Sequence, residues 1–315
     1  MHGKSITIIS IGGNTLIRQG ERGTIEEQFE HTEKCMASIA RMAAGGSSIV
    51  ITHGNGPIVG NIVIRNEAAK EIIPPMPLYI CNADSEGGIG FMIQQSLYNQ
   101  LNQLNIQRDA TTIVTQVVVD EHDTAFSNPT KPIGPFYTKA EAERIQNEKG
   151  WVMVEDSRRG YRRVVPSPRP LRIIEADVIR KFALDGVMVI AAGGGGVPVI
   201  ESEDGGLKGV DAVIDKDLAT AVLAHAIGAE TFIDLTSIDR VYIHFGEPNQ
   251  AGLSRLTVSE ARRYLAAGEF APGSMGPKIE AAIEFLEDGG QEVIITMPEL
   301  LEPTLKGKAG TRITA

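Results

Sequence analysis

The sequence predicts an α/β fold built on a mainly parallel sheet. Short runs rich in β-branched residues alternate with segments of helical periodicity, which is typical of βαβ units with right-handed crossovers. The composition agrees, because the chain of 315 residues contains 34 glycines and only 5% aromatic residues. A chain of this length can bury a large core in one domain or in two lobes.

In the first third of the chain, three expected strands alternate with helices. The strands are expected over residues 5–11, 48–52 and 110–118. One helical pattern ends at Gly45-Gly46, and two further helices are expected over residues 58–69 and 89–104.

The middle of the chain interrupts this alternation, and residues 120–170 are expected to form an insertion that stands off the main sheet. Three prolines make residues 126–135 look like extended irregular chain. A short helix is expected over residues 139–149, and residues 152–154 are expected to pair with residues 162–165 as a hairpin.

The alternation resumes after the insertion. Strands are expected over residues 187–192, 231–235 and 293–296, and helices over residues 218–227 and 278–286. Pro277 and Gly289 support the last helix, because proline favours the first helical turn and glycine the position past the last.

The formal net charge of -10 argues against a general binder of nucleic acid or membrane surfaces, since no basic excess offsets phosphate charge. It leaves room for small anionic substrates, which need only a local positive site. Arg158, Arg159, Arg162 and Arg163 form such a patch, although a short run of charge is also typical of a solvated face.

The two cysteines, Cys35 and Cys81, do not make a disulfide framework, so a reducing cytoplasm is the expected compartment. No signal peptide is expected, because the chain enters a strand almost directly. The uncharged run over residues 187–200 is too short to span a bilayer.

Four of the expected strands end in small, polar or glycine-rich turns. These turns are Gly12-Gly13-Asn14, His53-Gly54-Asn55-Gly56, the four glycines at 193–196, and Thr236-Ser237. Ligands of open parallel sheets bind outside the carboxyl ends of strands, and glycine lets backbone N–H groups approach an anion closely. Any one of these turns is better explained as a tight turn, but four at one edge favour an anionic ligand.

Several common sites are excluded because their motifs are absent. The sequence has neither a P-loop nor the glycine fingerprint of an ordinary dinucleotide site. It also lacks a Cys/His cluster with zinc spacing and the glycine-flanked serine of a nucleophile elbow.

Three lysines stand at positions that are unusual for surface charges. Lys216 lies between two acids at an expected helix start, Lys278 follows a Gly-Pro pair at another, and Lys131 lies on a proline-rich segment. Phosphoryl transfer depends mostly on positioning and on neutralisation of charge, for which a lysine near a helix N-terminus is well suited. Solvation at the surface is the usual explanation for any single lysine, so only the three lysines together indicate phosphoryl transfer.

These features resemble carbamate kinases of the amino-acid kinase superfamily, in the same order and over almost the whole chain. The specific blocks include Thr52-His53-Gly54-Asn55-Gly56-Pro57, Asn128-Pro129-Thr130-Lys131-Pro132-Ile133-Gly134-Pro135-Phe136, Ala212-Val213-Ile214-Asp215-Lys216-Asp217 and Phe270-Ala271-Pro272-Gly273-Ser274-Met275-Gly276-Pro277-Lys278. The block around Lys131 is typical of carbamate kinases more than of their relatives.

The resemblance implies an open α/β/α sandwich with a small protruding subdomain, assembled as a homodimer. Residues 1–185, including the subdomain at about 120–170, would form the acceptor-binding lobe, and residues 186–315 the nucleotide-binding lobe. The reaction would be ATP plus carbamate giving ADP plus carbamoyl phosphate, run toward ATP synthesis in arginine catabolism. ATP or ADP would bind with Mg²⁺, which usually keeps water and substrate oxygens as ligands.

Site residues follow from the resemblance by position. Gly12, Gly13, Asn14, Gly54 and Asn55 would bind carbamate or its phosphate. Lys131, Lys216 and Lys278 would neutralise the transferring phosphoryl group. Gly194, Gly195, Thr236, Asp239, Tyr242 and Met275 would lie near the nucleotide. Asp217 would orient the lysines, although an outer role toward Mg²⁺ stays open for it and for Asp215.

Two positions matter most for the mechanism that the resemblance implies. Many relatives have a lysine in the first strand where this chain has Ser10, and Lys131 would supply that charge from the subdomain. His53 is expected to be a turn residue rather than a general base, because carbamate is already an anionic oxygen nucleophile.

One stretch departs from the family pattern. The chain has Asp84-Ser85-Glu86-Gly87 where the family has Met-Ser/Thr-Gln-Gly. The two acids are expected to be neutralised by the arginine patch, to face solvent, or to mark a changed acceptor. A kinase of the same fold acting on another small carboxylate therefore stays open, as does a nucleotide or metabolite sensor without catalysis.

Overall fold

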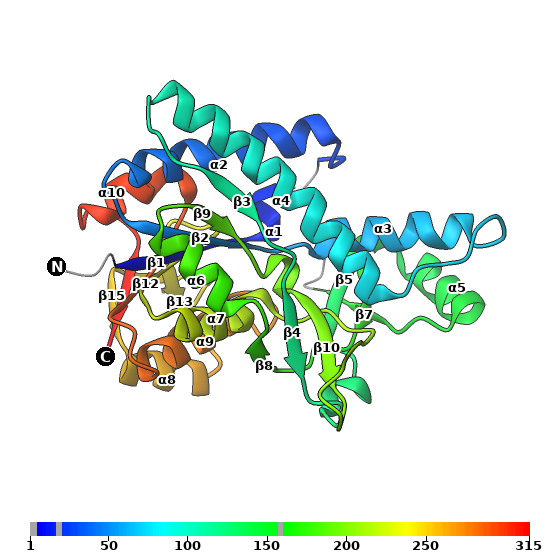
Figure 1. Cartoon of the computed structure of the whole chain (residues 1–315). Coiled ribbons are helices and arrows are strands. Elements are labelled where there is room, and N and C mark those ends of the chain that lie inside the picture. The colour runs from blue at the N-terminus through cyan, green and yellow to red at the C-terminus, as the bar shows by residue number, and fades with distance from the viewer. Residues whose placement is uncertain (1–4, 17–20, 157–159) are drawn as a thin grey trace.

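The structure of the chain, a computed structural model, describes residues 5–16, 21–156 and 160–315. Its main element is an eight-stranded sheet with helices on both faces (Figure 1). The strand order is β15-β17-β16-β12-β1-β2-β9-β3. The predicted α/β/α sandwich is confirmed.

Most of this sheet is parallel, as predicted. The parallel strands are β16 (Glu292–Thr296), β12 (Ala229–Leu235), β1 (Ile6–Ile11), β2 (Ser48–His53), β9 (Met188–Ile190) and β3 (Ala110–Thr112). At one end, β17 (Thr311–Thr314) pairs antiparallel with β16, and β15 (Arg255–Thr257) pairs parallel with β17.

A hydrophobic core fills each face of the sheet. Successive strand residues point to opposite faces, and in β1 the side chains of Ile6 and Ile8 join one core while Ile9 and Ile11 join the other. The first core is covered by α6 (Ala176–Leu184), α7 (Lys216–Ile227) and α9 (Met275–Glu287). The second is covered by α2 (Ile25–Ala43) and α4 (Leu78–Gln103). The same alternation turns Ser10 toward the α7 face.

The remaining helices are short or peripheral. They are α1 (Gly13–Leu16), α3 (Gly56–Ala69), α8 (Val258–Ala266), α10 (Leu301–Leu305) and the 3₁₀ turns η1 (Thr124–Phe126), η2 (Gly193–Gly195) and η3 (Pro298–Leu300). Within the described ranges, no helix is long and apolar enough to cross a membrane.

A second sheet has four strands and corrects one prediction. Its order is β11 (Leu207–Gly209), β10 (Val197–Glu201), β4 (Gln116–Val119) and β8 (Pro170–Ile173). The single strand predicted over residues 110–118 is wrong, because β3 ends at Thr112 in the main sheet and β4 begins in the second one. Hydrophobic alternation does not reveal a change of sheet, since both strands are partly buried.

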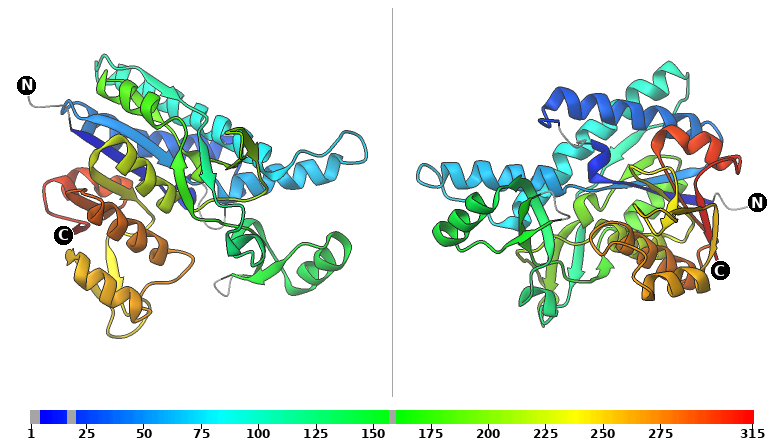
Figure 2. Two further views of the ribbon diagram at one scale, coloured as in Figure 1. Left: turned by 60° about the horizontal axis from the view of Figure 1, so that its bottom comes forward. Right: turned by 180° about the vertical axis from the view of Figure 1, so that it is seen from behind.

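A third sheet, with α5 (Lys139–Lys149), stands off the main body (Figure 2). It contains β5 (Lys131–Tyr137), β7 (Tyr161–Val165) and β6 (Met153–Glu155). The predicted helix and hairpin are confirmed, but the irregular chain predicted up to residue 135 is wrong from Lys131 onward. Among the residues that the structure describes, β5 pairs with β7 alone, and an edge strand tolerates prolines because one side needs no N–H donors.

Helix α4 begins eleven residues before the predicted start, at Leu78 rather than at residue 89. Its first turns contain the buried polar residues Asn82, Ser85 and Glu86, together with glycines. These residues hide the apolar periodicity that a sequence pattern detects.

The four predicted turns lie along one edge of the main sheet. Strands β12, β1, β2 and β9 are parallel neighbours, so their carboxyl ends point the same way. The prediction that these turns share one edge of the sheet is confirmed. The boundary between two lobes near residue 185 stays a prediction.

Candidate functional site

The turns after β1 and β2 contact each other through their backbones. The Gly54 N–H donates to the Ile11 carbonyl at 2.9 Å, and the Gly12 N–H donates to the Leu235 carbonyl at 3.0 Å. A Cβ on Gly54 would lie 2.8 Å from the Gly13 nitrogen, which is too close for any other residue type. Gly54 is therefore required by close backbone approach. The side chain of Asn14 lies outside the described part of the structure.

Two of the predicted lysines meet beneath these turns. The Lys278 ammonium donates to Asp234 Oδ2 at 2.7 Å and lies 3.3 Å from Asp217 Oδ2. The Lys216 ammonium donates to Asp217 and, at 2.7 Å, to the Ser10 hydroxyl. All five side chains are nearly buried, so the two lysines and two aspartates form a compact charge cluster.

The charges in this cluster fix each other's protonation states. Burial alone would raise the pKa of Asp217, but Lys216 and Lys278 outweigh it and hold that pKa well below its usual range. Burial alone would lower the pKa of Lys278, but Asp217 and Asp234 raise it above its ordinary value. Asp217 and Lys278 are therefore both charged at neutral pH, and the two aspartates hold the two ammonium groups of the cluster in fixed positions.

Lys131 reaches the same region from β5. Its ammonium donates to Asp215 Oδ2 at 2.5 Å and remains about a quarter exposed. Asp215 is the N-cap of α7 and accepts the backbone N–H of Asp217 and of Leu218 with its other oxygen. Lys131 is thus joined to the start of the helix that carries Lys216, through the residue that directly precedes Lys216.

Asn55 lies on the other side of the turns, against α4. Its Nδ2 donates to Asn82 Oδ1 at 3.1 Å and to the Ser85 hydroxyl at 2.8 Å. A Cβ on Gly194 would lie 2.1 Å from this nitrogen, so the turn after β9 passes directly over the Asn55 amide.

The two acids of the atypical stretch differ in position. Asp84 is exposed, which agrees with one of the expectations for it. Glu86 is fully buried and accepts the backbone N–H groups of Gly193 and Thr115, so the expectation of solvent or of arginine partners is wrong for it. Burial raises the pKa of Glu86 to about 8.

The arginine patch lies partly outside the described residues, because Arg158 and Arg159 fall there. Arg162 bonds to Asp156 and to the Gly134 carbonyl. Arg163 stacks over the Trp151 ring, 4.1 Å from its centroid. Both are engaged within the small third sheet.

His53 is buried in the turn after β2. Burial lowers its pKa to about 4, so the ring is neutral at physiological pH. Its Nε2 has no hydrogen-bond partner within the ranges that the structure describes. This environment suits a turn residue, as expected from the sequence.

The predicted nucleotide residues divide into two groups. Thr236 follows β12, and Asp239 accepts the Tyr242 hydroxyl at 2.7 Å on the ribbon of β13 (Val241–Ile243) and β14 (Ala251–Leu253). Met275 begins α9. Gly194 and Gly195 lie elsewhere, after β9, where a Cβ would meet Asn55 and the Ile214 carbonyl respectively.

Sequence reasoning missed two residues that organise the site. Asp234 anchors both buried lysines, and the available signal was an acid between the apolar residues Ile233 and Leu235 of β12. Thr115 holds the turn after β9, since its hydroxyl accepts the Ala192 N–H and its carbonyl accepts the Val197 N–H. Nothing in its sequence context distinguishes Thr115 from an ordinary strand residue.

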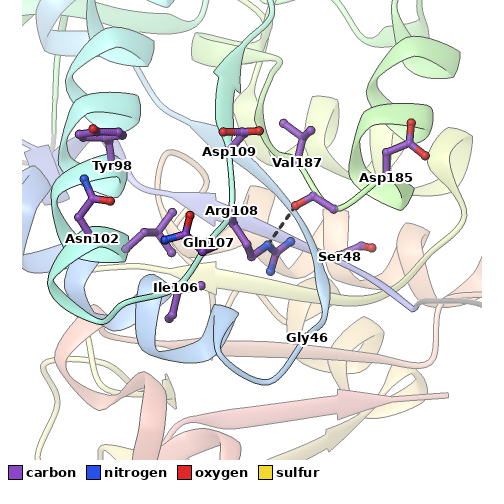
Figure 3. Close-up of a pocket in the computed structure, with 12 residues that line it drawn as sticks. Gly46, Ser48, Tyr98, Asn102, Ile106, Gln107, Arg108, Asp109, Asp185 and Val187 are labelled. Atoms are coloured by element: carbon purple, nitrogen blue, oxygen red, sulfur yellow. Dashed lines mark hydrogen bonds between the residues drawn. The ribbon is translucent and has the colours of Figure 1, made fainter.

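A cavity of about 720 Å³ lies at the opposite, amino edge of the sheet (Figure 3). Its lining includes Ser48 at the start of β2, Asp109 before β3 and Val187 before β9. Arg108 crosses it and donates to the carbonyls of Gly186, Ser47 and Ala43. This cavity is separated from the lysine cluster by the length of the strands.

Comparisons with known proteins agree on one family. A family model described as the amino acid kinase family matches residues 5–297. A carbamate kinase from Pyrococcus horikoshii is 46% identical over 98% of this chain and 98% of its own length. A carbamate kinase-like protein from Escherichia coli is also 46% identical, over 98% of this chain and 99% of its own.

Solved structures agree with the sequence relatives. The carbamate kinase from Giardia lamblia bound to citric acid has a TM-score of 0.94 and 40% identity, over 100% of this chain and 99% of that one. The same Giardia enzyme bound to AMP-PNP has a TM-score of 0.90 at 40% identity and the same coverage.

Proposed function

This chain belongs to the amino acid kinase family, and we propose that it is a carbamate kinase that transfers a phosphoryl group reversibly between ATP and carbamate. Relatives and solved structures described as carbamate kinases match it over nearly their whole length. The observation that carries the proposal is the convergence of Lys216, Lys278 and Lys131 on the glycine-lined carboxyl edge of the sheet.

The chemistry requires positioning rather than proton transfer. A carbamate oxygen attacks the γ-phosphorus of ATP, a new O–P bond forms, and the bond from that phosphorus to the β,γ-bridging oxygen breaks to release ADP. Carbamate is already an anion, so no general base is needed, and the neutral, buried His53 fits a site without one. Fixed lysines would stabilise charge on the phosphoryl oxygens through the transition state.

The proposed roles follow the geometry. Lys216 and Lys278 neutralise the charge of the transferring phosphoryl group, and Asp217 orients these two lysines. Lys131 adds positive charge from the small third sheet. Gly12, Gly13, Asn14, Gly54 and Asn55 bind the acceptor. Thr236, Asp239, Tyr242 and Met275 bind the nucleotide, with residues 186–315 as the nucleotide lobe. The resemblance implies a position near the nucleotide for both Gly194 and Gly195. For Gly194, the contact with Asn55 favours the acceptor side instead.

Mg²⁺ would enter with the nucleotide. Asp215 is engaged by Lys131, and Asp217 and Asp234 are engaged by the two buried lysines, so these carboxylates suit outer contacts better than direct ligation. In the described ranges no group of three or more His, Cys, Asp or Glu side chains could hold a metal. When bound, Mg²⁺ neutralises phosphate charge and takes its ligands mainly from phosphate oxygens and water.

The cellular setting is part of the proposal. We expect a cytoplasmic homodimer that works toward ATP synthesis in arginine catabolism. Helix α4 carries two exposed aromatic residues one heptad apart, Phe91 and Tyr98, which supports an interface on that helix.

The competing proposal is that the acceptor is another small acid. A relative described only as carbamate kinase-like supports it. Its sequence argument was the Asp84/Glu86 departure. Because both Glu86 oxygens are engaged by backbone N–H groups and burial raises the pKa of Glu86 to about 8, this acid is mostly uncharged at neutral pH, and carbamate is favoured.

A coupled assay tests the proposal directly. The enzyme is supplied with ADP, Mg²⁺ and either carbamoyl phosphate or acetyl phosphate, and ATP formation is followed. Rapid ATP formation is expected with carbamoyl phosphate as the phosphoryl donor and not with acetyl phosphate. ATP from neither donor, with activity toward another acid, would support the competing proposal, and tight ADP binding without any transfer would support a sensor.

A further inference from the structure

Glu86 connects α4 to the two strand ends that border the site. Its Oε1 accepts the Gly193 N–H at 2.9 Å, and its Oε2 accepts the Thr115 N–H at 3.1 Å. The residue is fully buried. A buried acid whose two oxygens both bond to loop backbone is a fixed clamp between the end of β9 and the start of β4.

The turn held by this clamp has an unusual backbone. Ala192 has φ 48°, and Gly194, Gly195 and Gly196 have φ of 66°, 91° and 83°. A non-glycine residue in the left-handed region is held there at a cost by its surroundings. A Cβ on Gly193 would lie 2.8 Å from Glu86 Cγ, so glycine at this position is what lets the carboxyl group approach.

The turn in its held position supports Asn55. Gly194 covers the Asn55 amide from one side. On the other side the Ser85 hydroxyl, from the residue next to Glu86, accepts from Asn55 Nδ2 at 2.8 Å. Asn55 is therefore fixed between two elements that Glu86 ties together.

We propose that Glu86 is a positioning residue for the acceptor, which sets the orientation of Asn55 by fixing the turn at 193–196. This inference rests on the proposed function, since it assigns Asn55 to the acceptor side. Its distinctive consequence is selectivity: nucleotide binding at the β12 and α9 side is not affected, because two strands, β1 and β2, separate β9 from β12.

Three variants test this role. Glu86→Leu has similar volume and accepts neither N–H group, and Glu86→Gln retains one amide oxygen for one of them. Gln94→Leu is the matched control, because Gln94 also lies on α4 and accepts one strand N–H, that of Thr112, at 3.0 Å. Steady-state KM values for carbamoyl phosphate and for ADP, and amide hydrogen exchange at Gly193 and Thr115, are the measurements.

For Glu86→Leu, the KM for carbamoyl phosphate is expected to rise at least about tenfold, since two hydrogen bonds to a buried acid are lost. The KM for ADP stays within about twofold, and exchange at Gly193 and Thr115 accelerates, because only the acceptor side loosens. Glu86→Gln falls between wild type and Glu86→Leu, and Gln94→Leu leaves both KM values unchanged.

Three results overturn the inference: an unchanged KM for carbamoyl phosphate in a folded Glu86→Leu enzyme, an equal rise in both KM values, or the same rise in Gln94→Leu. If Glu86→Leu does not fold, Glu86→Gln decides by the same criteria. If the wild-type enzyme makes no ATP from carbamoyl phosphate, the proposed function fails separately. The inference is then decided by amide exchange, and unchanged exchange at Gly193 and Thr115 overturns it.

Discussion

The pairing of Lys216 and Lys278 with Asp217 and Asp234 determines how individual residues respond to mutation. Each lysine is nearly buried beside carboxylates that are nearly buried as well. Removing one partner of such a group leaves a charge without compensation, which is far more destabilising than losing an exposed ion pair. The cluster should therefore contribute to stability and to catalysis together.

Replacing Lys278 with methionine is expected to lower kcat by about 100-fold or more, by analogy with loss of one transition-state donor. The melting temperature should also fall, because Asp234 loses its 2.7 Å partner. The measurements are ATP formation and thermal unfolding, with Lys208→Met on the exposed strand β11 as the control. Wild-type kcat in a folded Lys278→Met enzyme contradicts the assigned role.

The raised pKa of Glu86 predicts a pH dependence of stability. In the unfolded chain this group ionises near 4.5, whereas burial raises its folded pKa to about 8. Between these values the folded state binds the extra proton, so the free energy of unfolding falls as pH rises from about 4.5 to 8. Compared with Glu86→Gln, wild type should lose stability on the order of several kcal/mol across this range.

Urea unfolding of wild type and Glu86→Gln at pH 5 and pH 8 measures this difference. His53 acts in the opposite direction, because its pKa is lowered to about 4 and its contribution is lost as pH falls from about 6.5 to 4. Glu175 also raises the Glu86 pKa. The titration of His53 is common to the two proteins and cancels, whereas the repulsion by Glu175 is part of what raises the Glu86 pKa and is absent from Glu86→Gln. If the free energies of unfolding of the two proteins change with pH in parallel, Glu86 is ionised throughout and the prediction is wrong.

At the scale of elements, the small third sheet makes a close backbone contact with α3. A Cβ on Gly60 of α3 would lie 2.0 Å from the Gly134 Cα and 2.1 Å from its nitrogen, both on β5. Neither atom belongs to a flexible side chain, so the two elements can touch only because residue 60 is glycine, and Gly134 has a φ of 75° that favours glycine there. This contact fixes the strand that carries Lys131.

Gly60→Ala is expected to destabilise the protein by about 1–3 kcal/mol through overpacking, and to lower kcat because β5 and Lys131 are displaced. Gly88→Ala is the matched control on α4, since its Cβ would meet nothing within 4 Å and alanine favours a helix by roughly 0.5–1 kcal/mol. Gly60→Ala should lower the melting temperature and kcat, whereas Gly88→Ala should lower neither. Equal behaviour of the two variants contradicts the contact's importance.

The elements were predictable from sequence where local patterns determine them. Helix α5 has a capping box at Thr138 and ends at Gly150 in the left-handed region, and both signals are visible in the sequence. Helix α4 was predicted too short because Asn82, Ser85 and Glu86 are buried polar residues with partners far away in the chain. Such partners depend on tertiary contacts that periodicity does not contain.

At the scale of the whole molecule, the sheet order brings distant segments together. Ser10, Lys216, Asp234 and Lys278 meet because β12 and β1 are neighbours and α7 and α9 cover the same face. Lys131 joins them from β5 through Asp215, the N-cap of α7. The sequence predicted the glycine turns and the lysines, since their spacing and helix-start positions are local features. It did not predict Asp234 as their common partner, or that Lys216 would bond to Ser10, because both follow from packing.

The central claim is that phosphoryl transfer depends on a lysine delivered by the small third sheet. The most direct test is the kcat for ATP formation in Lys131→Ala, compared with Lys139→Ala, which removes an exposed lysine of the neighbouring helix α5. We expect kcat to fall about 100-fold in Lys131→Ala and to stay within about twofold in Lys139→Ala, with both proteins folded. Full turnover in Lys131→Ala would contradict the claim.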